Sequence, residues 1–186
     1  MKNYTIVLLL TLTSLPVLSQ VANFTAINVG TGKSISLSDF KSSPGVVVIF
    51  TSSGADCPYD QYYLSRLQKI ARDFESKLPV LFVNPHLADS EDAMKSSASK
   101  FGEYYLSDKE QAVMQALKAT KSPETFVLKN SGGNFSIFYH GAIDDNAQVA
   151  SDVHENYLAD AISALLAGQT PKSKEVRPVG CIIRRK

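Results

Sequence analysis

Apolar and polar residues alternate along this chain with a period that changes from segment to segment. Residues 46–50 form an unbroken β-branched and aromatic run, which is typical of a strand buried on both faces in a parallel sheet covered by helices. Apolar residues then recur at helical spacing over residues 64–74 and predict a helix. Pro58 can begin this helix, because a proline at the first helical position loses no hydrogen bond. Residues 80–83 are a second apolar run and predict the next strand.

Hydrophobic spacing and turn residues predict the remaining elements. These are an extended lead-in over residues 24–40, helices over 90–101, 107–117 and 153–167, a short strand over 104–106, and a hairpin of strands 125–128 and 135–139. Strands that alternate with helices imply a parallel sheet, and the late hairpin adds antiparallel strands at one side. We therefore expect one α/β domain over residues 20–168, with a central mixed sheet flanked by helices, followed by a tail over residues 169–186.

The first twenty residues differ from the rest of the chain. Lys2 is followed by an almost entirely apolar run over residues 6–18, and Val17 and Ser19 are small enough to precede a cleavage site. This pattern predicts a secretory signal peptide over residues 1–19. The run is shorter than the roughly 20 residues of a membrane-spanning helix, although an uncleaved anchor is the alternative. We expect an exported protein, periplasmic or secreted, with no membrane span in its mature form.

Composition and charge exclude several classes of function. The chain has 19 basic and 18 acidic residues. It has no long run of basic residues of the kind that would indicate a nucleic-acid partner. His86, His140 and His154 are scattered along the chain, so we expect no metal site and no cofactor. The chain has two cysteines, Cys57 and Cys181, which are too few for a disulfide scaffold. In an oxidising compartment they are either a pair or a reactive thiol with a helper.

Cys57 is predicted at the N-cap or in the first turn of the helix that follows the 46–50 strand. The unpaired N–H groups there carry partial positive charge and stabilise a thiolate, which is the nucleophile toward disulfides and peroxides. Asp60, one turn further on, would oppose this effect if it came close, and Arg66 is too far along the helix to help. The alternative is that Cys57 is a small buried apolar residue.

Several segments resemble a known family. The 46–50 strand, the loop ending in Cys57 and the helix behind it resemble the active-site element of thioredoxin-fold proteins, and residues 122–126 resemble their cis-proline loop. The further matching segments are Cys57-Pro58-Tyr59, residues 63–67, residues 139–146, residues 157–161 and residues 180–183. In this order they resemble the peroxiredoxin-like redoxins of the alkyl-hydroperoxide-reductase and thiol-specific-antioxidant superfamily, over nearly all of residues 24–186.

This resemblance implies a thioredoxin-like fold and a set of site residues. Cys57 would be the nucleophile, and Pro58, Ser122 and Pro123 would bind the substrate. The Ser122–Pro123 bond would be cis and within about 5 Å of Cys57, with the preceding backbone available to pair with a docked substrate strand. The implied substrates are a protein thiol or disulfide, or a peroxide, and turnover would need an external reductant.

The chain departs from the family at two positions. Typical thioredoxins carry Cys-x-x-Cys, whereas here Asp60 takes the second place if Cys57 is the first cysteine, and Gly54 takes the first place if Cys57 is the second. Typical peroxiredoxins have a threonine three residues before the reactive cysteine, and Gly54 stands there. An ordinary dithiol cycle therefore cannot take place within this motif.

Cys181 leaves three alternatives open. It can resolve an oxidised Cys57, because the glycine and proline content of the tail is typical of a mobile segment that can reach across the domain. It can also be locked to Cys57 permanently, or it can stay apart from Cys57. A permanent cross-link over 124 residues (57 to 181) would stabilise the fold by about 4–5 kcal/mol in the chain-entropy model. The main hypothesis is a thiol–disulfide oxidoreductase or peroxidase-like redoxin, and the alternative is a non-catalytic binding module stapled by the disulfide.

Overall fold

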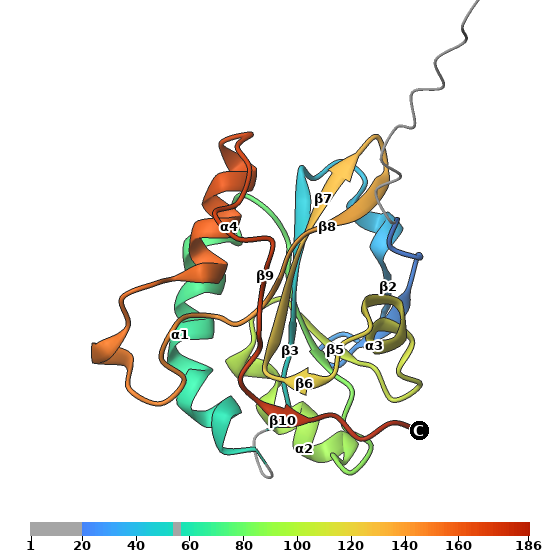
Figure 1. Ribbon diagram of the computed structural model, residues 1–186. Helices are drawn as coiled ribbons and strands as arrows, with labels where there is room; N and C mark the ends of the chain where they lie inside the picture. The colour runs from blue at the N-terminus through green and yellow to red at the C-terminus, as the bar shows by residue number, and fades with distance from the viewer. Residues whose placement is uncertain (1–19, 54–56) are drawn as a thin grey trace, which may run out of the picture.

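The computed structural model describes residues 20–53 and 57–186, so the expected signal peptide and Gly54 lie outside the described residues. The described chain forms an eight-stranded mixed sheet in the order β2-β1-β5-β4-β3-β7-β8-β9 and a two-stranded sheet of β10 and β6 (Figure 1). The strands are β1 (Thr25–Asn28), β2 (Ser34–Ser36), β3 (Gly45–Phe50), β4 (Val80–Asn84), β5 (Tyr104–Ser107), β6 (Lys121–Ser122), β7 (Glu124–Ser131), β8 (Asn134–Gly141), β9 (Glu175–Val176) and β10 (Cys181–Ile182). The helices are η1 (Leu37–Phe40), α1 (Pro58–Phe74), α2 (Glu91–Ser97), η2 (Ala98–Lys100), α3 (Ala112–Leu117), η3 (Ala150–Asp152) and α4 (Tyr157–Leu166).

The centre of the sheet is the part that the hydrophobic pattern predicted best. β3 pairs in parallel with β4 and antiparallel with β7, and β7 and β8 form the expected hairpin. Every residue of β3 is buried, as its unbroken apolar sequence indicated. The predicted α/β class, with a mixed sheet between helices, is confirmed.

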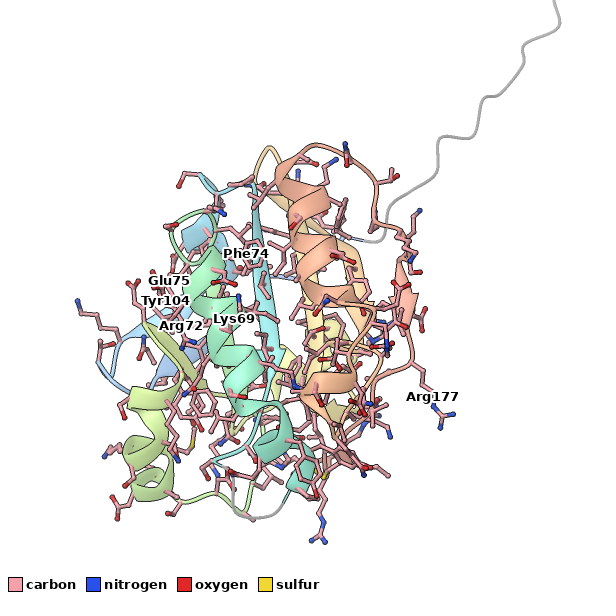
Figure 2. The ribbon with its side chains drawn as sticks, turned by 90° about the vertical axis from the view of Figure 1, so that its left-hand side faces the viewer. Lys69, Arg72, Phe74, Glu75, Tyr104 and Arg177 are labelled. Carbon is pink, nitrogen blue, oxygen red and sulfur yellow. A yellow bond between two sulfur atoms is a disulfide. The ribbon has the colours of Figure 1, made fainter. Side chains whose placement is uncertain are left out.

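Two apolar layers cover the sheet because side chains of a strand point alternately to its two faces. Val47 and Ile49 of β3 face a cluster with the buried sides of α1, α2 and α4, and Figure 2 shows α1 and α4 side by side over this face. Val46, Val48 and Phe50 face the other cluster, which contains α3 and η1. Among the described residues, no helix is long and apolar enough to cross a membrane.

Three predicted helices have different bounds in the structure. The helix expected over residues 107–117 begins only at Ala112, because the Asp108 carboxylate accepts hydrogen bonds from the N–H groups of Val113 and Met114, and Gln111 takes a left-handed conformation (φ 57°). The helix expected over residues 90–101 is divided into α2 and η2, and the one expected over residues 153–167 is shortened to α4. A side chain that caps a helix from outside is invisible to hydrophobic spacing.

The tail over residues 169–186 contains two short strands that the hydrophobic pattern did not predict. β9 pairs in parallel with β8, and β10 pairs antiparallel with β6, where Cys181 lies opposite Ser122. Ile183, directly after β10, is only 3% exposed and belongs to the cluster under α3. The tail is therefore held across one end of the domain, beside the start of α1 (Figure 1).

Candidate functional site

Cys57 is the N-cap residue of α1, and Pro58 occupies the first helical position. The backbone of Cys57 is extended, with φ −122° and ψ 111°, so the chain turns into the helix at this residue. Its side chain lies at the positive end of a 17-residue helix, as the sequence predicted. Cys57 is also 3% exposed, because the C-terminal tail lies against it.

Cys57 and Cys181 form a disulfide, with their Cα atoms 5.9 Å apart. The Sγ atom of Cys57 also lies 3.2 Å from the carbonyl oxygen of Ser122. A disulfide sulfur has no proton, so this contact becomes a hydrogen bond only when Cys57 is a free thiol. Of the three alternatives for Cys181, the structure therefore excludes a tail thiol that never meets Cys57.

The Ser122–Pro123 peptide bond is cis, as expected. Ser122, the residue before the proline, makes the contact to Cys57 and also pairs with Cys181 through β6 and β10. The structure thus gathers Cys57, Pro58, Cys181, Ser122 and Pro123 at one end of the sheet, although they are distant in the sequence.

Asp60, expected to oppose the Cys57 thiolate or to replace a second cysteine, is a buried anchor of the site. Its carboxylate accepts hydrogen bonds from the backbone N–H of Ser52 at 3.1 Å, the Ser52 hydroxyl at 2.6 Å and the Ser122 hydroxyl at 2.9 Å. Burial raises the pKa of Asp60, although these hydrogen bonds and the nearby His86 partly offset the effect. One side chain in the first turn of α1 therefore ties the end of β3 to the cis-proline loop.

Asp89 fixes the chain beside Ser52 in a similar way. Its Oδ2 atom accepts hydrogen bonds from the Ser53 N–H at 2.7 Å, the Ser53 hydroxyl at 2.6 Å and the Asn84 side-chain amide at 2.7 Å. Although burial opposes it, this set of donors lowers the pKa of Asp89. The Nε2 atom of His86, in the same loop, is buried and has no hydrogen-bond partner among the described residues.

A buried glutamate holds the cis-proline loop from its other side. Glu124 accepts hydrogen bonds from the N–H groups of Thr120 and Lys121, both at 2.8 Å, and its second oxygen lies 2.6 Å from Nε2 of His140. Burial opposes ionisation, but His140 and the two backbone donors lower the pKa of Glu124. The contact between Glu124 and His140 was not predicted from the sequence. The one indication of it in the sequence was an acidic residue directly after Pro123.

Arg66 is engaged away from the cysteines. Its Nη1 atom lies 2.6 Å from Oδ2 of Asp144 and also donates to the carbonyl of Asn146 at 2.6 Å. The arginine therefore braces the segment after β8, in agreement with the expectation that it is too far along α1 to assist Cys57. Within residues 20–53 and 57–186, no group of three or more His, Cys, Asp or Glu side chains is arranged to hold a metal ion.

Comparisons with known proteins agree with the fold. The model of the AhpC/TSA family matches residues 17–133, and the search of curated proteins finds no match. A hypothetical protein from Sinorhizobium meliloti 1021 is 27% identical with a TM-score of 0.78, over 92% of this chain and 95% of that one. An uncharacterized conserved protein from Geobacillus kaustophilus is 26% identical with a TM-score of 0.79, over 92% and 93%. The exposed lipoprotein thioredoxin of Streptococcus pneumoniae strain TIGR4, at 19% identity and a TM-score of 0.54 over 79% and 99%, shares the fold.

Proposed function

Because this chain belongs to the AhpC/TSA family of thioredoxin-fold redoxins, we propose that it is an exported thiol–disulfide oxidoreductase, with Cys57 as nucleophile and Cys181 as resolving thiol. The observation that carries the proposal is the Cys57–Cys181 disulfide, which joins a helix N-cap to a strand docked beside the cis-proline loop. Such a bond is what remains after a substrate disulfide has been reduced.

The proposed cycle balances in two steps. In the reduced protein the Cys57 thiolate attacks a substrate disulfide, which forms a mixed disulfide and releases one substrate thiolate. The Cys181 thiolate then attacks Sγ of Cys57, forms the observed disulfide and releases the second substrate thiolate. The substrate gains two electrons and the protein loses two. Because the chain has no third cysteine, an external thiol must reduce the disulfide again.

Accessibility suggests which sulfur the external thiol attacks. Cys181 is partly exposed in the disulfide, whereas Cys57 is almost fully buried. Attack on Cys181 makes Cys57 the leaving thiolate, and the N-terminus of α1 stabilises its charge. The carbonyl of Ser122 and the carboxylate of Asp60 near the site disfavour a thiolate and partly offset this stabilisation.

Two features favour disulfide exchange over peroxide reduction. The edge beside Cys57 accepts a polypeptide strand, as its pairing with β10 illustrates, and a disulfide-bonded protein presents such a strand. The sequence also has Gly54 where peroxiredoxins carry the threonine that activates the peroxide. Export is supported by the signal-like pattern of residues 1–19 and by the disulfide itself, because such bonds persist in oxidising compartments.

A second candidate function is a non-catalytic binding module in which the disulfide is a permanent staple. The burial of Cys57 and the backbone hydrogen bonds that hold the tail favour this alternative. The two candidates differ in whether mild thiols open the disulfide and whether its opening is coupled to reduction of another molecule.

The test is reduction of a disulfide-bonded protein such as insulin by dithiothreitol, with and without the full-length chain. We expect the wild type to accelerate the reaction, and Cys57→Ser to abolish the acceleration. Pre-reduced Cys181→Ser, mixed with the substrate after dithiothreitol has been removed, should complete one exchange and accumulate a mixed disulfide on Cys57 that intact-mass analysis detects. Acceleration of hydrogen peroxide reduction alone would assign peroxidase chemistry instead, and full activity of Cys57→Ser would refute the proposal.

A further inference from the structure

The tail lies in a seat that recognises polypeptide backbone. We define the tail seat as the surface of Gln111, Thr120, Ser122 and α3 that residues 180–186 cover. Cys181 pairs with Ser122, and the N–H of Ile183 donates to the carbonyl of Thr120 at 2.9 Å. Because these are main-chain contacts, they do not depend on the identity of the seated chain, and any extended peptide in the same register can make them.

Gln111 continues this backbone recognition past the end of β10. Its side-chain amide donates to the carbonyl of Arg184 at 2.7 Å, and its Oε1 accepts from the N–H of Lys186 at 2.8 Å. Gln111 is fully buried and also donates to the carbonyl of Pro85 at 3.2 Å, so its side chain is fixed. Gln111 therefore forms hydrogen bonds with the backbone of the seated chain, as a neighbouring β-strand would.

Position 180, directly before Cys181, admits only glycine in this register. A Cβ atom built on Gly180 would lie 2.5 Å from the carbonyl oxygen of Ser122 and 2.9 Å from the nitrogen of Pro123. Both are backbone atoms of the loop that Asp60 and Glu124 fix, so they cannot move aside as a flexible side chain would. A seated chain with any other residue here must shift away from Cys57.

The position two residues after the cysteine is an apolar pocket. Ile183 is 3% exposed and belongs to the buried cluster of Val113, Leu117 and Ala119, whereas Ile182 points outward and is 76% exposed. Alternation along the strand explains the difference, because residues 181 and 183 share one face. The seat therefore selects the second residue after the cysteine and leaves the first unselected.

We propose that the tail seat is the substrate groove of this protein. It selects extended polypeptides that have glycine directly before the substrate cysteine attacked by Cys57 and a large apolar residue two positions after that cysteine. This inference rests on the proposed function, whose nucleophile it uses. The tail is an intramolecular mimic of that substrate. It leaves the seat when an external thiol opens the Cys57–Cys181 bond, and it returns when Cys181 displaces the product thiolate from Cys57.

The test uses the full-length chain with Cys181→Ser and Ile183→Asp, which removes the resolving thiol and drives the tail from its pocket. The probe is a synthetic peptide with the sequence of residues 178–186, whose cysteine is activated as a mixed disulfide with thionitrobenzoate. Attack by Cys57 joins the peptide to the protein and releases coloured thionitrobenzoate, so the rate is read directly. Three altered peptides carry alanine for the glycine, serine for the second isoleucine, or serine for the first isoleucine as the matched control.

We expect alanine for the glycine, and serine for the second isoleucine, each to lower the second-order rate constant by about tenfold or more. Serine for the first isoleucine should change it by less than about threefold, since that side chain stays in solvent. Free cysteine activated in the same way measures the intrinsic reactivity of Cys57. Equal rates for all four peptides, with a reactive free-cysteine probe, would overturn the groove and leave the proposed function standing.

No reaction with the free-cysteine probe would refute the proposed function itself. Thermal unfolding shows whether the double variant is folded. If the double variant is unfolded, the single variant Cys181→Ser is used in its place. The peptides then compete with the tail for the seat, so we expect the same order of rates at lower absolute values. A different order in that variant would equally overturn the groove.

Discussion

Asp108 contacts the start of α3, the helix that forms part of the tail seat, and its titration tests how this contact stabilises the fold. Its carboxylate is buried and accepts hydrogen bonds from the N–H groups of Val113 at 3.1 Å and Met114 at 2.9 Å, at the start of α3. Burial raises the pKa of Asp108 to about 6, although these hydrogen bonds partly offset the effect. Because the pKa is higher in the folded than in the unfolded chain, folding takes up a proton, and stability falls as the pH rises through this range.

The magnitude follows from the two pKa values. Asp108 has an ordinary pKa of 3.8 and a folded value of about 6. At about 1.4 kcal/mol per pKa unit, ionisation of Asp108 removes up to about 3 kcal/mol of folding free energy between pH 4 and pH 7. The effect is absent below the unfolded pKa, where both states are protonated, and it is complete above the folded one.

The perturbation is Asp108→Asn, and the assay is urea unfolding of variant and wild type at pH 4 and pH 7. At pH 4 we expect the variant to be less stable by roughly 1 kcal/mol, because an amide oxygen accepts fewer hydrogen bonds than the two carboxyl oxygens. At pH 7 the difference should shift in favour of the variant by up to about 3 kcal/mol. Asp152→Asn, at an exposed carboxylate, is the control. A stability difference for Asp108→Asn that does not change with pH would refute the reasoning.

Two further substitutions test the support of the site. Ile183→Ala removes most of a buried side chain worth about 2 kcal/mol and should raise the reduction potential of the disulfide by up to about 40 mV, whereas Ile182→Ala, at an exposed position, should change it little. Equilibration with dithiothreitol measures both shifts, and equal shifts would contradict the anchoring role of Ile183. Glu124→Gln removes the charge that Thr120, Lys121 and His140 contact, and should destabilise the fold by about 2–4 kcal/mol in urea unfolding. Glu103→Gln, at an exposed position, is its control, and an equally small effect of both substitutions would show that Glu124 does not support the loop.

The sequence predicted those parts of the fold that local patterns encode. β3, α1 and β4 are long enough to show their periods, and they were identified to within one residue. The β7–β8 hairpin was also predicted, although both of its strands are longer than expected. The position of Cys57 at a helix start followed from Pro58 and the apolar spacing behind it. The cis bond before Pro123 came from a resemblance to a known loop rather than from any local pattern.

The contacts that complete the site are nonlocal, and the sequence could not show them. β6 and β10 are two residues each and have no period to detect, so the sequence did not predict that they pair. Asp60 meets Ser122 across 62 residues, and the pair of Glu124 and His140 depends on the β7–β8 register. Buried polar networks of this kind are decided by tertiary packing, which hydrophobic patterning does not describe.

The central claim is that the Cys57–Cys181 disulfide is exchanged in function, and its reduction potential tests this most directly. The full-length protein is equilibrated with dithiothreitol buffers of defined potential, quenched with an alkylating reagent, and the reduced fraction is read by mass. We expect a potential above about −300 mV, within the range in which thiol systems open and reform a bond. A potential well below about −300 mV, typical of permanent structural disulfides, would contradict it and favour the stapled binding module.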